Sequence, residues 1–350
     1  MTHAWLFTGP PGSGRSNAAR AFAAALQCED AGCGHCHSCT TVSAGSHPDV
    51  TLINTAGLSI GVDAVREYVR TAALRPALGR WQIMIVEDAD RLTDQAANAL
   101  LKAIEEPAAR AIWMLCAPSV EDVVITIRSR CRAVLLRTPP IGDIAELLVT
   151  RDGVEPELAA AAAAASQGHI GRARGLARDP AARERRQSVL RIPSSLRSVA
   201  DCLQAAQQIV DDATASANHR AESLEQRELD DLKQGWGVED RGRRPAGYAG
   251  ALSALDKEQK RRRTRLVRDA IDAVLLDLLA LCRDIVAVQM GTGAPLINAD
   301  AAAEIARLAQ LWTSESTIHT IDAIVRCRED LAANAALPLT LERMMLEFHR

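Results

Sequence analysis

Apolar runs in the first third of the chain alternate with stretches of helical spacing. Four short apolar runs predict strands, at residues 4–7, 82–86, 111–116 and 133–136, and the run at 82–86 has the pattern of a buried strand. One helix is predicted over 16–26. Another begins behind Thr93 and ends at Pro107. Strands that alternate with helices predict a parallel sheet in an α/β domain.

The rest of the chain is helical in pattern. Thr138-Pro139-Pro140 marks a boundary, and a long helix after residue 265 has one apolar face, formed by Leu266, Ile271, Val274, Leu275, Leu278, Cys282 and Ile285. We therefore predict three domains. They are an α/β domain over 1–137, a helical lid over 138–178 and an all-helical domain over 179–350, with a charged surface loop near 233–248.

Composition and charge narrow the class of protein. The chain has 350 residues and a formal net charge of −3, so any contact with DNA must come from a local patch or from partner subunits. It lacks an apolar run of about 18 residues, and its first residues lack the basic segment of a signal peptide. We expect a cytoplasmic protein with no membrane span.

Four of the nine cysteines lie within residues 28–39, in a C-x4-C-x2-C-x2-C pattern. Cys28, Cys33, Cys36 and Cys39 could close a tetrahedral zinc site, which would be structural because no position is left open for water. His35 or His37 could replace one of the thiols, and free thiols are the remaining alternative.

A glycine-rich loop follows the first predicted strand and has the pattern of a phosphate-binding P-loop. Gly9, Gly12 and Gly14 allow backbone N–H groups to wrap phosphates, and a helix begins at Ser16. The usual lysine is replaced by Arg15, whose planar guanidinium is bulkier than an ammonium group. We expect the P-loop fold without competent nucleotide turnover. The alternative is a glycine turn that only joins strand to helix.

Two acidic residues end the strand over 82–86. In P-loop ATPases, acids at this position hold magnesium and activate the attacking water. Here Glu87 precedes Asp88, which reverses the usual order and puts the shorter side chain at the position of the base. ATP and magnesium are candidate ligands of this site, but a pair of solvated acids at a strand end is the alternative.

Three segments behind the P-loop carry a resemblance to a known family. They are Asn98-Ala99-Leu100-Leu101-Lys102, Glu105-Glu106-Pro107 and Arg128-Ser129-Arg130-Cys131. In this order they resemble signature segments of the bacterial clamp-loader subunits of DNA polymerase III, which are AAA+-type proteins. The resemblance implies a P-loop domain with a small zinc module, a helical lid and an all-α collar that joins subunits in a ring.

The resemblance also implies a role for Arg130. It matches the family's arginine finger, which enters the ATP site of a neighbouring subunit and stabilises charge on the transferred phosphoryl group. Taken alone, the tripeptide Ser129-Arg130-Cys131 is a weak signal, and a surface salt bridge of Arg130 is the alternative. The family's polar sensor is replaced by Ala117-Pro118, and Gly171 stands where a lid arginine is expected, with Arg172 one residue on. This chain therefore resembles the family's non-hydrolysing member.

The partners that the resemblance implies are gamma or tau motor subunits, the delta subunit, the sliding clamp and, through the complex, primed DNA. In this interpretation the chain is a stator at one end of the ring. The rival interpretations are an active gamma- or tau-type ATPase and a zinc-bearing P-loop regulator outside replication. The segment 222–265 matches no family motif, and its basic run Lys260-Arg261-Arg262-Arg263 is either a solvated helix face or a contact for DNA or an acidic partner.

Overall fold

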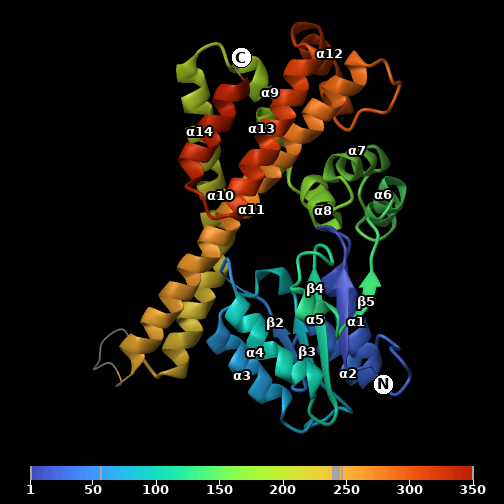
Figure 1. Cartoon of the computed structure of the whole chain (residues 1–350), viewed down its shortest axis with the longest axis vertical. Helices are drawn as coiled ribbons and strands as arrows, with labels where there is room; N and C mark the ends of the chain where they lie inside the picture. Colours follow the sequence, from blue (N-terminus) through green and yellow to red (C-terminus); the bar gives the residue numbers. More distant parts are fainter. Residues whose placement is uncertain (1, 56, 239–244, 246, 349–350) are drawn as a thin grey trace. The chain divides into compact units, whose positions relative to one another are not determined.

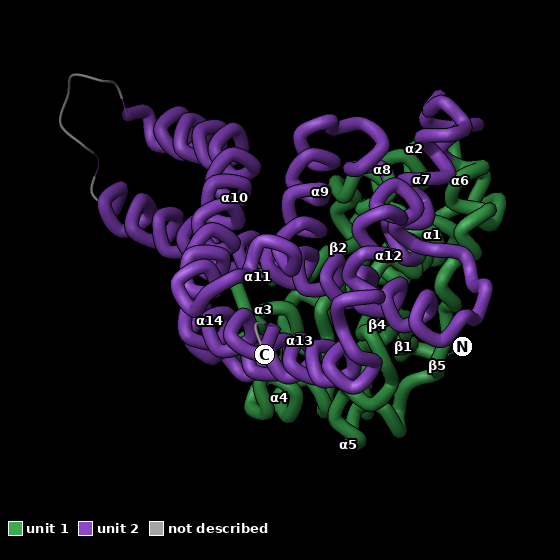
Figure 2. The backbone as a smooth tube through the Cα atoms, turned by 90° about the horizontal axis from the view of Figure 1, so that it is seen from above, with its two compact units in different colours: residues 1–147, 168–173 green, residues 148–167, 174–350 purple. Residues whose placement is uncertain are grey.

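The computed structural model describes residues 2–55, 57–238, 245 and 247–348. It contains two compact units (Figure 2). The first comprises Met1–Leu147 and Gly168–Ala173, and the second comprises Leu148–Gln167 and Arg174–Arg350. Helices α6 and α8 are shared between the units, and the division into three domains stays a prediction.

The first unit is built on a five-stranded parallel sheet in the order β2-β3-β4-β1-β5 (Figure 1). The strands are β1 (Ala4–Thr8), β2 (Val50–Ile53), β3 (Gln82–Val86), β4 (Ala111–Ala117) and β5 (Arg132–Leu135). Every residue of β3 and β4 is buried, as expected for central strands covered on both faces. Four strands confirm the prediction, whereas β2 was not predicted.

Helices cover both faces of this sheet. They are α1 (Arg15–Gln27), α2 (His37–Ala44), α3 (Val62–Ala72), η1 (Ala89–Arg91), α4 (Asp94–Glu105) and α5 (Ile125–Arg128). Because side chains alternate along a strand, Trp113 and Leu115 pack in a core with α3 and α4, while Ile112 and Met114 pack in a core with α1 and α2. The predicted α/β domain is confirmed.

All remaining described elements are helices. They are α6 (Ile141–Thr150), α7 (Pro156–Ser166), α8 (Ile170–Arg178), α9 (Pro180–Ser195), α10 (Val199–Gly235), α11 (Tyr248–Gln289), η2 (Ala299–Ala301), α12 (Ala302–Leu311), α13 (Ser314–Ala332) and α14 (Leu337–Phe348). The core of the second unit lies between α10, α11, α13 and α14, and α11 buries Ile271, Leu275 and Leu278 in it. These residues belong to the predicted apolar face, so that helix is confirmed. Among the described residues, no helix combines the length and the apolar character that crossing a membrane requires.

Helices α10 and α11 continue together past this core as a two-helix hairpin, residues 213–235 and 248–266, which we call the arm (Figure 1). Its seam first buries Ala213, Ala217 and Ala221. The seam then changes to polar residues, which we call the polar layer, formed by Glu225, Glu228, Gln259, Arg262 and Arg263. The predicted charged loop lies partly outside the described residues, at 239–244 and 246; the described parts extend α10 and begin α11.

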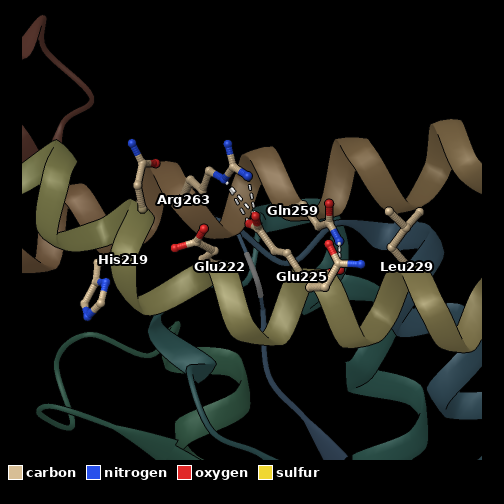
Figure 3. A pocket seen from close by; sticks show the side chains of 8 residues that line it. His219, Glu222, Glu225, Leu229, Gln259 and Arg263 are labelled. Atoms are coloured by element: carbon tan, nitrogen blue, oxygen red, sulfur yellow. Dashed lines mark hydrogen bonds and ion pairs between the residues drawn. The ribbon is translucent and has the colours of Figure 1, made fainter.

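The polar layer accounts for two of the four residues of the basic run in α11. Arg263 Nε donates to both oxygens of Glu225, at 2.9 and 3.0 Å. Arg262 binds Glu228 through two parallel hydrogen bonds of 2.9 and 2.7 Å. Figure 3 shows Arg263 reaching across from α11 to Glu225 on α10, beside an open groove. Two of the four basic residues therefore neutralise carboxylates of the neighbouring helix and do not form a free cationic surface.

Candidate functional site

The glycine-rich loop lies at the carboxyl edge of the sheet, where β1 ends and α1 begins. Gly9 N donates to Ala117 O at 3.3 Å, which ties the loop to the end of β4. Gly14 adopts a left-handed conformation, with φ of +82°, and Arg15 is the first residue of α1. A helix amino terminus behind such a loop favours an anion, because its N–H groups and dipole point toward the loop.

Gly12 allows another backbone segment to approach this loop closely. Its φ is +89°, and an added Cβ would lie 2.3 Å from His169 Cα. Only glycine fits, since even a methyl group would overlap the 168–173 segment. Burial lowers the pKa of His169, as do the nearby charges of Arg172 and Arg15, whereas a backbone hydrogen bond acts in the opposite direction. His169 is therefore neutral near pH 7.

Arg15 is turned onto the loop's own backbone. Its Nη1 donates to Gly9 O at 2.8 Å and so joins the end of the loop to its beginning. Three buried polar atoms around the loop have no hydrogen-bond partner among the described residues: Thr8 Oγ1, Ser13 Oγ and Arg15 Nε. Each of them can donate a hydrogen bond, so the chemistry of the site suits the oxygens of an anion.

The acids at the end of β3 are already engaged or buried. Glu87 Oε1 accepts from Arg20 Nε at 3.2 Å and from Arg20 Nη2 at 2.7 Å. Asp88 is 9% exposed. Burial raises the pKa of the nearby Asp90. The Glu87 carboxylate is therefore engaged by Arg20 and is not a free acid at the end of β3.

Ala117 and Gly171 stand where the family pattern has a polar sensor and a lid arginine. Ala117 ends β4 with a fully buried methyl group, and its carbonyl accepts from the P-loop. Gly171 faces the imidazole ring of His169, and Arg172 N donates to His169 Nδ1 at 3.1 Å. Neither Ala117 nor Gly171 offers a polar side chain to the loop.

Arg130 lies near the amino-terminal ends of the strands, whereas the P-loop follows the carboxyl-terminal end of β1. It follows α5 and precedes β5, whose first residue, Arg132, is in register with Trp5 near the start of β1. The P-loop follows the other end of β1, a strand of 5 residues, so the two sites are separated by about 13 Å of extended chain. Arg130 therefore cannot reach a phosphate on its own P-loop.

The guanidinium of Arg130 is fixed by three neighbours. Its Nε pairs with Glu105 Oε1 at 2.6 Å. Its Nη1 donates to Thr126 O at 2.8 Å and to Ser129 Oγ at 3.2 Å. The Arg130 side chain remains 41% exposed, so it is held in one orientation while solvent or a partner can still reach it.

The four cysteines converge between α1 and α2. The sulfur atoms of Cys28, Cys33, Cys36 and Cys39 all lie within 4.8 Å of one another. Cys28 Sγ is 3.7 Å from the sulfurs of both Cys33 and Cys36. Tetrahedral zinc with Zn–S bonds of about 2.3 Å requires sulfur atoms about 3.8 Å apart, so the thiols fit this metal.

Backbone amides support the same cluster. Cys36 N donates to Cys33 Sγ and Cys39 N donates to Cys36 Sγ, both at 3.4 Å. Backbone hydrogen bonds from Cys33 and Gly32 lower the pKa of Cys28 to about 6, which favours the thiolate that a metal binds. Among the described residues, no histidine joins this group, and His35 Nδ1 lies 3.0 Å from the Cys33 carbonyl oxygen.

A buried acid and a buried amide fasten the loop before β3. Asp49 accepts from the backbone N–H groups of Ala77, Leu78 and Gly79, at 2.5, 2.8 and 2.6 Å. Burial raises the pKa of Asp49, but these hydrogen bonds outweigh it and leave the pKa below its usual range.

Gln27 holds the next two residues of the same loop. Its side-chain oxygen accepts from the backbone N–H groups of Arg80 and Trp81, and its amide nitrogen donates to Trp81 O at 2.6 Å. In the sequence, Asp49 and Gln27 each lie directly beside an apolar run. This position is the signal that could have identified them as buried polar residues.

A parallel sheet with a glycine-rich loop between its first strand and first helix defines a P-loop protein of the α/β class. Residues 1–140 match the family model described as DNA polymerase III, delta subunit, and residues 265–350 match the model for the C-terminal region of the delta subunit. Over these two segments the chain belongs to the DNA polymerase III delta subunit family.

Individual relatives match a shorter part of the chain. DNA polymerase III subunit delta' of Escherichia coli (strain K12) is 41% identical over 144 residues, which are 39% of this chain and 43% of the relative. Subunit delta' of Haemophilus influenzae is 36% identical over 157 residues, 44% and 48% of the two chains. Subunit tau of Bacillus subtilis is 35% identical over 136 residues, 38% and 24%. The chain thus spans less than half the length of each of these relatives.

Among solved structures, a gamma-subunit-related protein of Thermotoga maritima is similar with 17% identity and a TM-score of 0.36, covering 77% of this chain and 94% of that chain. No property of this chain is inferred from so low a similarity.

Proposed function

We propose that this chain is a delta'-type clamp-loader subunit that does not turn over ATP itself and supplies Arg130 to the nucleotide site of a neighbouring motor subunit. The position of Arg130 carries the proposal. It is held and accessible at the sheet edge opposite its own P-loop, so it can serve only a phosphate that another chain presents. A cation fixed in this way stabilises charge that develops during phosphoryl transfer.

The geometry of the P-loop supports the absence of turnover. Arg15 donates to the Gly9 carbonyl, and Glu87 is paired with Arg20. A bound nucleotide would meet Gly9, Gly12, Gly14, Arg15 and Ser16, and magnesium would meet Asp88 and Glu87. Binding and hydrolysis are separate properties, and the loss of a free carboxylate base affects hydrolysis. The isolated chain is expected to show no ATP turnover above background.

We further propose that Cys28, Cys33, Cys36 and Cys39 hold one structural zinc ion. Four thiolates fill the coordination sphere, so the ion would order residues 28–39 without catalysing a reaction. Elemental analysis should give one zinc per chain, and Cys36→Ser should lower that content. Equal zinc in both proteins would contradict the proposed site.

The proposed partners follow from the resemblance to clamp-loader subunits. A delta' subunit in a cytoplasmic loader would contact gamma or tau motor subunits and the delta subunit, and through the complex it would act on the sliding clamp and primed DNA. The likeness to the tau subunit of Bacillus subtilis supports a second candidate, an active motor subunit. ATP hydrolysis by the isolated chain would favour that candidate.

The test is a loader reconstituted from this chain with motor and delta subunits, assayed for ATPase stimulated by DNA and clamp. Arg130→Ala should leave assembly intact and lower hydrolysis at the facing site by about 10³-fold. Arg128→Ala is the matched control, because Arg128 belongs to the same segment but precedes the finger position. An assembled ring in which Arg130→Ala hydrolyses ATP normally would overturn the proposal.

A further inference from the structure

Arg130 pairs with Glu105, an acidic residue at the carboxyl end of helix α4. Glu105 is the last residue of α4. A negative charge at a helix carboxyl terminus is disfavoured by the helix dipole. Glu105 therefore does not stabilise its own helix; instead it forms an ion pair with Arg130 Nε.

The contacts of Arg130 divide its donors into two groups. Guanidinium has five N–H donors, one on Nε and two on each terminal nitrogen. Glu105 engages Nε, while Thr126 O and Ser129 Oγ engage Nη1. The guanidinium is thus held at two of its three nitrogen atoms, Nε and Nη1. The side chain is still 41% exposed, so an external acceptor can reach it.

We infer that Glu105 is a positioning residue for Arg130, an inference that rests on the proposed function. A free arginine side chain loses rotamer entropy when it is ordered. Glu105 restricts that freedom before the partner's phosphate arrives, so less order must be gained at the moment of reaction. The carboxylate acts only through the guanidinium that it holds.

The chain offers a matched pair of carboxylates for the test. Glu105 and Glu106 are adjacent in sequence, but only Glu105 pairs with Arg130. In the reconstituted loader, Glu105→Gln should lower kcat at the facing site by about tenfold with the KM for ATP unchanged, whereas Glu106→Gln should change neither. Surface ion pairs contribute little to stability, so both variants should fold and assemble.

A double variant separates positioning from an independent role. If Glu105 acts through Arg130, then Glu105→Gln combined with Arg130→Ala should be no slower than Arg130→Ala alone. Multiplied losses, or a normal rate for Glu105→Gln, would overturn the inference while leaving the arginine finger in place. A normal rate for Arg130→Ala would instead overturn the proposed function, and the inference with it.

Discussion

The P-loop and the polar layer of the arm both bury polar side chains, but only in the polar layer are these side chains hydrogen-bonded to each other. Around the P-loop, Thr8 Oγ1, Ser13 Oγ and Arg15 Nε have no partner among the described residues. In the polar layer, Glu225 is buried and yet accepts two hydrogen bonds from Arg263 Nε. One region thus leaves hydrogen-bonding capacity unused, and the other uses it between its own two helices.

This difference separates two reasons for burying a polar atom. An unpaired buried donor costs about 1–3 kcal/mol, and it persists where a fold is built around an external ligand. A paired polar layer inside a helical hairpin fixes which residues face each other, as buried polar residues do in coiled coils. The unpaired donors make the P-loop a candidate anion site, whereas the polar layer pairs residues of α10 with residues of α11.

The largest expected effect concerns the arm. Arg263→Leu should destabilise the arm by about 3 kcal/mol, because it leaves the Glu225 carboxylate buried without its cation. Glu225 has 7% of its side chain exposed, against 50% for Arg263, so the penalty arises at Glu225. Hydrogen–deuterium exchange of the amides in 213–235 and 248–266 would measure the loss locally.

Two further variants complete this test. Arg261→Leu, two residues earlier on an exposed position of α11, should leave exchange nearly unchanged. The double replacement of Glu225 and Arg263 by leucine should recover most of the stability, since no charge remains buried. If the double variant exchanges as fast as Arg263→Leu, the ion pair does not account for the stability of the arm.

The next effect concerns the close approach at the P-loop. Gly12→Ala should cost about 2 kcal/mol, from a left-handed backbone and from overlap with His169 Cα. Gly14→Ala has nearly the same φ, but an added Cβ there meets nothing within 4 Å, so it should cost only the backbone strain, about 1 kcal/mol. Thermal unfolding would compare the two, and equal losses would contradict tight packing of 168–173 on the loop.

The sequence predicted what local patterns encode. Strands β1, β3, β4 and β5 and helices α1 and α4 follow from apolar runs, a glycine-rich loop and the Thr93 cap, whose side chain accepts from Ala96 N. The spacing of four cysteines predicted their convergence. Strand β2, Val50–Ile53, was missed although β5 has the same length; Thr51 interrupts its apolar run, and two of its residues are half-buried.

What the sequence could not predict depends on partners far apart along the chain. Asp49 binds backbone amides that begin 28 residues later, and Arg263 binds a carboxylate 38 residues earlier. A run of basic residues looks the same whether its side chains face solvent or a neighbouring helix. Only the hairpin geometry shows that Arg262 and Arg263 turn toward α10, and only the fold shows that Glu105 contacts Arg130.

The smallest expected effect is a gain in the free energy of unfolding. It tests most directly whether the P-loop, unlike the arm, leaves buried polar atoms unpaired. Thr8→Val preserves the shape of a fully buried side chain whose hydroxyl lacks a described partner, so it should raise the free energy of unfolding by about 1 kcal/mol. Thr93→Val removes a hydroxyl that caps α4 and should lower it by about 1 kcal/mol. Urea unfolding of the full chain would measure both. A loss of stability in Thr8→Val would mean that its hydroxyl is hydrogen-bonded in solution, and the P-loop would then resemble the arm in satisfying its own polar atoms. A gain would mean that the Thr8 hydroxyl makes no hydrogen bond in solution, and the contrast with the arm would stand.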